Sequence, residues 1–97
     1  MLNMKEKISF RERQILLHSF IYYHADSNVI SDKQYDSLSY GLEKMIKEHP
    51  QEFKESEYYH IFYDWTPATG FDLIDRLSEQ ELYRVTNIAN VLLKPHL

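Results

Sequence analysis

Three serines in this chain begin sequence patterns that are typical of helix N-termini. Each is followed three residues later by Glu or Gln, in the pairs Ser9–Glu12, Ser31–Gln34 and Ser78–Glu81. In such a capping box, each of the two side chains accepts a hydrogen bond from a free backbone N–H at the helix start. The apolar residues that follow recur at steps of three or four, which matches a helix rather than a strand. The sequence therefore predicts helices near residues 10–24, 32–48 and 79–93.

The segments between these helices complete the predicted fold. Turn-forming residues at 25–28 end the first helix, and Pro50 ends the second, because the residue before a proline disfavours helical geometry. A further short helix is predicted over residues 67–77. Residues 57–65 alternate in a way that favours a short strand, for which residues 5–10 are the one candidate partner, with a helix as the alternative. The predicted fold class is mainly α, a small bundle of about four helices in a single domain spanning 1–97.

The composition excludes several classes of site. The chain has no cysteine, its five histidines lack metal-ligand spacing, and its two glycines are isolated, so we expect no metal and no glycine-rich phosphate loop. The net charge of −4 argues against a direct nucleic-acid binder. No apolar run is long enough for a signal peptide or a membrane span. We therefore expect a cytoplasmic protein with no membrane partner.

Acidic and aromatic residues gather around the turn between the first two predicted helices. Asp32 and Asp36 lie four residues apart on one face of the second helix, with no Lys or Arg four residues after either of them. Like charges at this spacing are destabilising by a few tenths of a kcal/mol. Tyr35 lies between them, and Tyr22 and Tyr23 end the preceding helix. These residues form either half of a binding site or merely a cap, a core position and a solvated face.

The order of residues in "YYHADSNVISDKQYDSLSYGLEKMIKEHP" resembles a known helical module. It is similar to the N-terminal Ia domain of bacterial NAD-dependent DNA ligases, which carries a tyrosine pair or Tyr-His, a short acidic loop, an I-S/P-D-x-x-Y-D-x-L run and a closing His-Pro. Here "ISDKQYDSL" matches that run position for position. The resemblance covers about residues 10–50, and residues 51–97 form a divergent aromatic segment and C-terminal helices.

The resemblance implies a ligand and a set of contacts. The ligase module grips the nicotinamide mononucleotide half of NAD, so Tyr22 and Tyr35 are expected to stack on the nicotinamide ring. Asp32 and Asp36 are expected to contact its carboxamide and ribose. Tyr23 stands where many ligases have histidine. The chemistry is reasonable, because a cationic ring is attracted to aromatic faces and carboxylates accept hydrogen bonds from hydroxyl and amide groups.

The resemblance also implies that this chain lacks the ligase chemistry. After Pro50 the match fails, and no K-x-D-G adenylation motif occurs in the sequence. The lysine that would attack the α-phosphate is therefore missing, and a nucleotidyltransferase domain does not fit in the remaining residues. We expect a non-catalytic protein.

A protein-interaction module is the alternative function. Residues 58–65 are rich in rings, and Tyr58, Tyr63 and Trp65 are candidate partner-binding residues because Tyr and Trp dominate binding hot spots. The same rings could instead complete the domain's own core. Stand-alone proteins that resemble the ligase module are typical of phages and prophages. Such a protein could inhibit a host or defence protein, in one version through an acidic face that mimics DNA, and it could form homo-oligomers.

Overall fold

The described part of the chain is mainly helical. The computed structural model describes residues 2–25 and 29–93, without the side chains of residues 69–71, so part of the predicted turn at 25–28 lies outside the described residues. The helices follow in the order α1 (Met4–His24), α2 (Asp32–Glu48), α3 (Pro50–Lys54), α4 (Tyr59–Phe62), the 3-10 helix η1 (Pro67–Arg76) and α5 (Glu79–Leu93). The prediction of a mainly α fold is confirmed. None of the described helices is both long and apolar enough to cross a membrane.

Two of the three predicted capping boxes are present. At the start of α2, the Gln34 amide donates to Ser31 Oγ at 3.1 Å, and the Ser31 amide donates to Gln34 Oε1 at 2.8 Å. At the start of α5, the Glu81 amide donates to Ser78 Oγ at 3.2 Å, and the Ser78 amide donates to Glu81 Oε1 at 2.8 Å. Each box satisfies two backbone donors that the helix itself leaves free, which fixes where α2 and α5 begin.

The predicted capping box at Ser9 is wrong. Helix α1 begins at Met4, and its N-cap is Asn3, whose side chain accepts a hydrogen bond from the Glu6 amide at 2.9 Å. Ser9 therefore lies inside the helix, where its hydroxyl donates to the Lys5 carbonyl oxygen at 2.9 Å. The same helix includes residues 5–10, which were the candidate partner strand.

Residues 57–65 contain a short helix and no strand, so the helical alternative holds for this segment. Helix α4 covers Tyr59–Phe62, and the buried side chains of the segment are Tyr58, Ile61, Phe62 and Trp65. Their steps of three, one and three residues place them on one face of a helical turn. Tyr59 and Tyr63 are more exposed than Ile61 and Trp65, although all four would share one face of a strand. Alternation between two strand faces therefore does not explain which side chains are buried.

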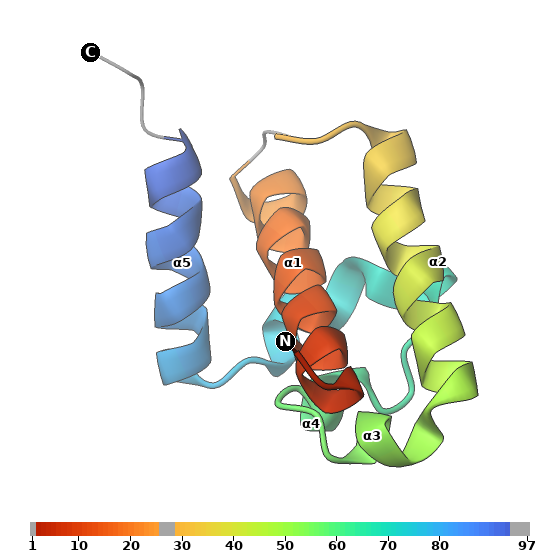
Figure 1. Ribbon diagram of the computed structural model, residues 1–97. Helices are drawn as coiled ribbons and strands as arrows, with labels where there is room; N and C mark the ends of the chain where they lie inside the picture. Colours follow the sequence, from red (N-terminus) through yellow and green to blue (C-terminus); the bar gives the residue numbers. More distant parts are fainter. Residues whose placement is uncertain (1, 26–28, 94–97) are drawn as a thin grey trace.

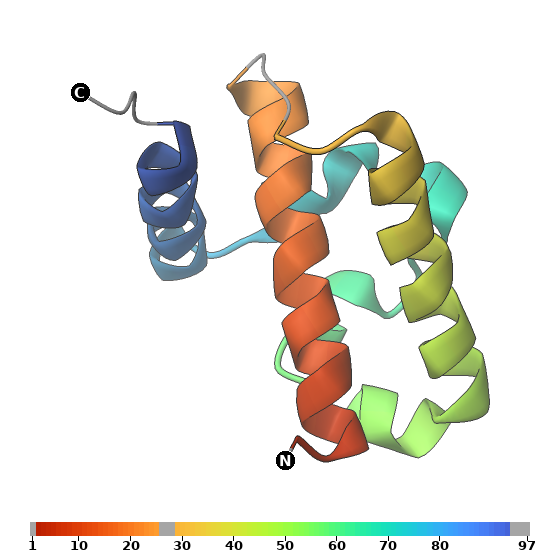
Figure 2. The ribbon, with the colours of Figure 1, turned by 45° about the horizontal axis from the view of Figure 1, so that its top comes forward.

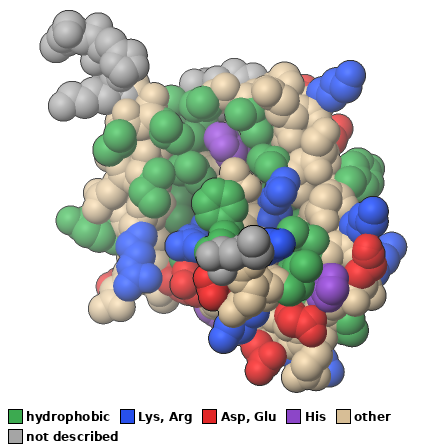
Figure 3. Space-filling view, viewed as in Figure 1, with side chains coloured by type: hydrophobic (Ala, Val, Ile, Leu, Met, Phe, Trp, Pro, Cys, Tyr) green, Lys and Arg blue, Asp and Glu red, His purple; other side chains and the backbone are tan. Residues whose placement is uncertain are grey.

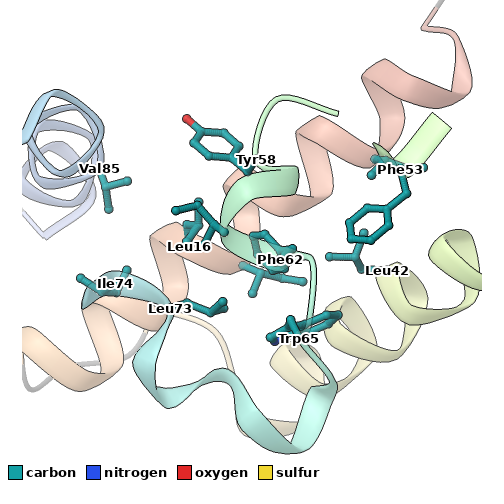
Figure 4. Close-up of a cluster of buried hydrophobic side chains, with 12 residues drawn as sticks. Leu16, Leu42, Phe53, Tyr58, Phe62, Trp65, Leu73, Ile74 and Val85 are labelled. Atoms are coloured by element: carbon teal, nitrogen blue, oxygen red, sulfur yellow. The ribbon is translucent and has the colours of Figure 1, made fainter. Parts of the chain in front are cut away.

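Helix α1 lies between α2 and α5, with α3 and α4 near its N-terminal end (Figures 1 and 2). The core side chains converge from all of these elements, as Figure 4 shows for Leu16 of α1, Leu42 of α2, Phe62 of α4, Leu73 of η1 and Val85 of α5. The end of α1 and the start of α2 lie at the same end of the molecule because only residues 25–31 separate them. This pairing places the predicted site residues of the two helices close together.

A buried carboxyl group ties α1 to the connection between α3 and α4. Glu12 is fully buried, and its Oε1 accepts a hydrogen bond from the Tyr58 amide at 3.2 Å. Ser56 Oγ lies 2.9 Å from Glu12 Oε2 and 2.7 Å from the Phe53 carbonyl oxygen. Burial raises the pKa of Glu12 to about 7, although the hydrogen bonds from Ser56 and from the Tyr58 amide lower it.

Burial favours the protonated form of Glu12, and the network can accommodate this form. A serine hydroxyl has one hydrogen, so Ser56 cannot donate to the Phe53 carbonyl and to the Glu12 carboxylate together. When Glu12 is protonated, its O–H donates to Ser56 Oγ, and Ser56 donates to the Phe53 carbonyl. The Phe53 carbonyl oxygen also accepts a hydrogen bond from the Ser56 amide at 3.0 Å, so every oxygen has a partner in either protonation state, and burial is what favours the neutral acid. Glu12 thus stabilises the fold most effectively as a neutral acid.

Candidate functional site

A small open cavity lies where α1 ends and α2 begins. Its volume is about 60 Å³, and it is lined by His18, Tyr22, Tyr23, Val29, Ile30, Ser31, Asp32 and Tyr35. Four of the five predicted ligand-binding residues therefore line one cavity. The fifth, Asp36, is not in the lining but follows Asp32 by about one turn of α2.

Tyr35 lines the side of this cavity that packs against the core. Its ring is half-buried against the core, and its hydroxyl lies 2.6 Å from the Ser19 hydroxyl of α1. Burial raises the pKa of Tyr35, while the hydrogen bond with Ser19 lowers it, and the net direction is upward. The phenol therefore stays neutral, and its hydrogen bond holds α2 against α1. Tyr35 serves as both a core residue and a wall of the cavity.

Tyr22 and Tyr23 line the side of the cavity that faces the solvent. Each side chain is 51% exposed, and their ring centroids lie 4.9 Å apart in an edge-to-face arrangement with an interplanar angle of 81°. An edge-to-face pair is a favourable aromatic arrangement that still leaves ring surface open to a ligand. The structure thus presents large apolar surface beside Asp32 at the mouth of the cavity.

The two aspartates carry uncompensated charge. Both are exposed on the first turns of α2, and neither forms an ion pair with any residue in the described ranges. Asp32 lies in the first turn, where the positive end of the helix dipole favours a carboxylate. The mouth of the cavity therefore combines aromatic surface with negative charge, which suits a cationic ring or a set of hydroxyl and amide donors.

His18 is a cavity residue that the sequence interpretation missed. Its Nδ1 is buried and has no hydrogen-bond partner among the residues that the structure describes. Burial lowers the pKa of His18, which favours the neutral imidazole. The signal was available in the sequence, because His18 precedes Tyr22 by four residues and residues at that spacing share one helix face.

The proposed partner-binding rings are placed differently from one another. Tyr58 and Trp65 are 4% and 8% exposed and belong to the core, whereas Tyr63 is 58% exposed. The Arg76 guanidinium lies 5.6 Å from the centroid of the Tyr63 ring. The burial of two of the three rings fits the alternative that they complete the core. Within residues 2–25 and 29–93, no group of His, Asp or Glu side chains is arranged to hold a metal ion.

Comparison with known proteins identifies the module to which this site belongs. The model of the family described as "DNA ligase-like, N-terminal NAD+-binding domain" matches residues 1–57. A DNA ligase from Endomicrobium trichonymphae is 34% identical over 48 residues, which are 50% of this chain and 7% of that relative. No solved structure matches the chain. The matched residues include all of α1 and α2, and therefore the whole cavity. The chain belongs to the family of DNA ligase-like, N-terminal NAD+-binding domains.

Proposed function

We propose that the cavity between α1 and α2 binds the nicotinamide mononucleotide half of NAD. The observation that carries this proposal is the convergence of Tyr22, Tyr23, Asp32 and Tyr35 on one cavity, from two helices that the family match covers. The tyrosine rings offer faces for the nicotinamide ring. Oxidised nicotinamide is cationic, so electron-rich rings with a nearby carboxylate attract it.

The size of the cavity fits only one end of this ligand. Pockets that enclose a whole ligand usually have volumes of roughly 300–1,000 Å³, whereas this cavity has about 60 Å³. The nicotinamide ring therefore enters between Tyr22 and Tyr35, and the ribose and phosphate stay at the mouth. The Asp32 and Asp36 carboxylates accept hydrogen bonds from the carboxamide and the ribose hydroxyls.

His18 supplies a further polar atom within the cavity. Its buried Nδ1 lacks a partner among the described residues, and a neutral imidazole can donate or accept a hydrogen bond there. A carboxamide, which carries both a donor and an acceptor, suits such a group. Residues 1–97 bind the nucleotide in this proposal without transferring any group, because they contain no adenylation lysine motif.

Calorimetric titration with nicotinamide mononucleotide tests the proposal. Because half of NAD is bound by one small open cavity, we expect a dissociation constant in the micromolar to millimolar range, roughly −8 to −4 kcal/mol. Tyr22→Ala and Asp32→Asn should each weaken binding, because both residues line the cavity. Tyr40→Ala is the matched control, because Tyr40 is 61% exposed on α2 and does not line the cavity.

Competition separates this site from a general nucleotide site. Adenosine monophosphate should not displace nicotinamide mononucleotide, because every contact proposed is to the nicotinamide half. Equal binding of the two nucleotides, or equal loss of binding in Tyr40→Ala and Tyr22→Ala, would contradict the proposal. Circular dichroism of each variant shows whether the helices are retained.

A further inference from the structure

A second hollow runs along the opposite side of α1, between α1 and α5. Its volume is about 690 Å³, and its lining includes Phe10, Arg13, Leu17, Arg84, Val85 and Ile88. We call this hollow the α1–α5 groove. Helix α5 begins after residue 57, so one wall of the groove lies outside the family match. The groove is therefore a feature of this chain that the ligase resemblance does not explain.

The α1–α5 groove is apolar at its base and at its edges. Leu16 and Val85 are buried beneath it, while Phe10 and Ile88 are 49% and 52% exposed along its sides. Figure 3 shows hydrophobic side chains gathered in a strip between α5 and α1. Two parallel rows of apolar side chains on neighbouring helices form the kind of groove in which a third helix packs.

The charges beside the groove are predominantly positive, although the chain has a net charge of −4. Arg13 and Arg84 line the groove with a single acid, Glu57. Neither arginine forms an ion pair within the described ranges, and the Arg13 guanidinium lies 6.0 Å from the centroid of the Phe10 ring. Within the described ranges, two cationic groups thus flank exposed apolar surface without a direct ion pair.

We propose that the α1–α5 groove docks an amphipathic helix of a partner protein, with apolar residues along one face and Asp or Glu beside them. The apolar row would fill the groove, and the acids would pair with Arg13 and Arg84. A second copy of this chain fits less well. In a symmetric contact the same patch occurs on both sides, so the arginine pairs of the two copies would face each other.

A displayed library of peptides of 15 residues, the length of α5, tests this proposal. Peptides are selected on the wild-type protein, and those that also bind Ile88→Glu are removed. The expected survivors have apolar residues at steps of three and four and carry Asp or Glu. A survivor should bind the Arg13→Glu/Arg84→Glu double variant about tenfold more weakly or worse, because two opposite charges become like charges.

Two further variants keep the test independent of folding effects. Phe10→Ser removes apolar surface from the α1 side and should also weaken binding, whereas Tyr83→Ser should bind like wild type. Tyr83 is the matched control because it is 69% exposed on α5 and does not line the groove. Circular dichroism is expected to show the same helix content in all of these variants.

Three results would overturn the proposal. The first is that no peptide in the library binds wild type more tightly than it binds both Ile88→Glu and Phe10→Ser. The second is a set of survivors without acidic residues, or with unchanged affinity for the double arginine variant. The third is a concentration-dependent dimer in sedimentation that Ile88→Glu abolishes, which would assign the groove to contact between copies of this chain.

Discussion

Replacing Glu12 by glutamine should change how the stability of the protein depends on pH. Glutamine keeps the shape of the side chain and is neutral at every pH. Its carbonyl oxygen can accept the hydrogen bond from the Tyr58 amide, and its NH₂ group can donate to Ser56 Oγ, which lies 2.9 Å from the present Oε2. The variant therefore imitates the protonated acid that burial favours.

The sign of the effect follows from the raised pKa of Glu12. Below pH 4.5 the carboxyl is protonated in both the folded and the unfolded states, so it contributes no pH dependence. Between pH 4.5 and about 7 the unfolded chain releases this proton while the folded protein retains it, so rising pH favours unfolding. Each unit of pKa difference corresponds to about 1.4 kcal/mol, so wild type should lose about 3 kcal/mol relative to Glu12→Gln across this range.

Urea denaturation followed by circular dichroism, repeated at a series of pH values, measures this difference. The free energy of unfolding of Glu12→Gln should exceed that of wild type increasingly from pH 4.5 to about 7 and by a constant amount at higher pH. Glu48→Gln removes one exposed carboxylate from α2 and controls for the change in net charge. A difference between Glu12→Gln and wild type that is independent of pH would refute the account of a buried neutral acid.

Three other substitutions test the packing, each by urea denaturation. Leu42→Ala should lower the free energy of unfolding by about 2–5 kcal/mol, because Leu42 is fully buried; a neutral effect would contradict its place in the core. Gly41→Ala should raise this free energy by about 0.5–1 kcal/mol, because alanine is a better helix former than glycine. The added Cβ would lie 3.7 Å from Arg11 Nη1, which is an ordinary van der Waals contact; destabilisation would show that the Arg11 side chain cannot adjust. Tyr35→Phe should lower the free energy of unfolding by about 0.5–1.5 kcal/mol through loss of the hydrogen bond with Ser19, and an unchanged value would mean that this bond contributes nothing.

The capping boxes show what the sequence can and cannot predict. Ser31 and Ser78 each follow a turn and precede a helix, and the structure has both boxes where the spacing places them. Ser9 has the same spacing to Glu12, but the helix already begins at Met4. The spacing alone does not reveal that Glu12 is needed in the core, where it binds residues 44 and 46 positions away along the chain.

The segment around α4 was harder to predict because nearly every residue in it is large and apolar or aromatic. Alternation then fits almost any such run, and only burial distinguishes the strand from the helix. The buried positions Tyr58, Ile61, Phe62 and Trp65 follow helical steps. Long-range packing against α1 and η1 buries these four side chains and leaves Tyr63 exposed, which the local sequence does not specify.

Most of the candidate site could be predicted, since a turn of known length joins two well-defined helices. The tyrosines at the end of α1 and the acids at the start of α2 had to lie at the same end of the pair. The contribution of His18 was not recognised, because a lone histidine on a helix is usually structural. The hydrogen bond between Ser19 and Tyr35 depends on the packing of the two helices, which the periodicity of each helix alone does not determine.

The most direct test of the central proposal is a titration of the isotope-labelled protein with nicotinamide mononucleotide, followed in assigned two-dimensional amide NMR spectra. The account predicts saturable shifts for His18, Tyr22, Ser31 and Asp32, which line the cavity. Ile88, which lines the α1–α5 groove, should not shift. If saturating ligand moves no cavity resonance, or moves those of the groove instead, the cavity between α1 and α2 is not the nucleotide site.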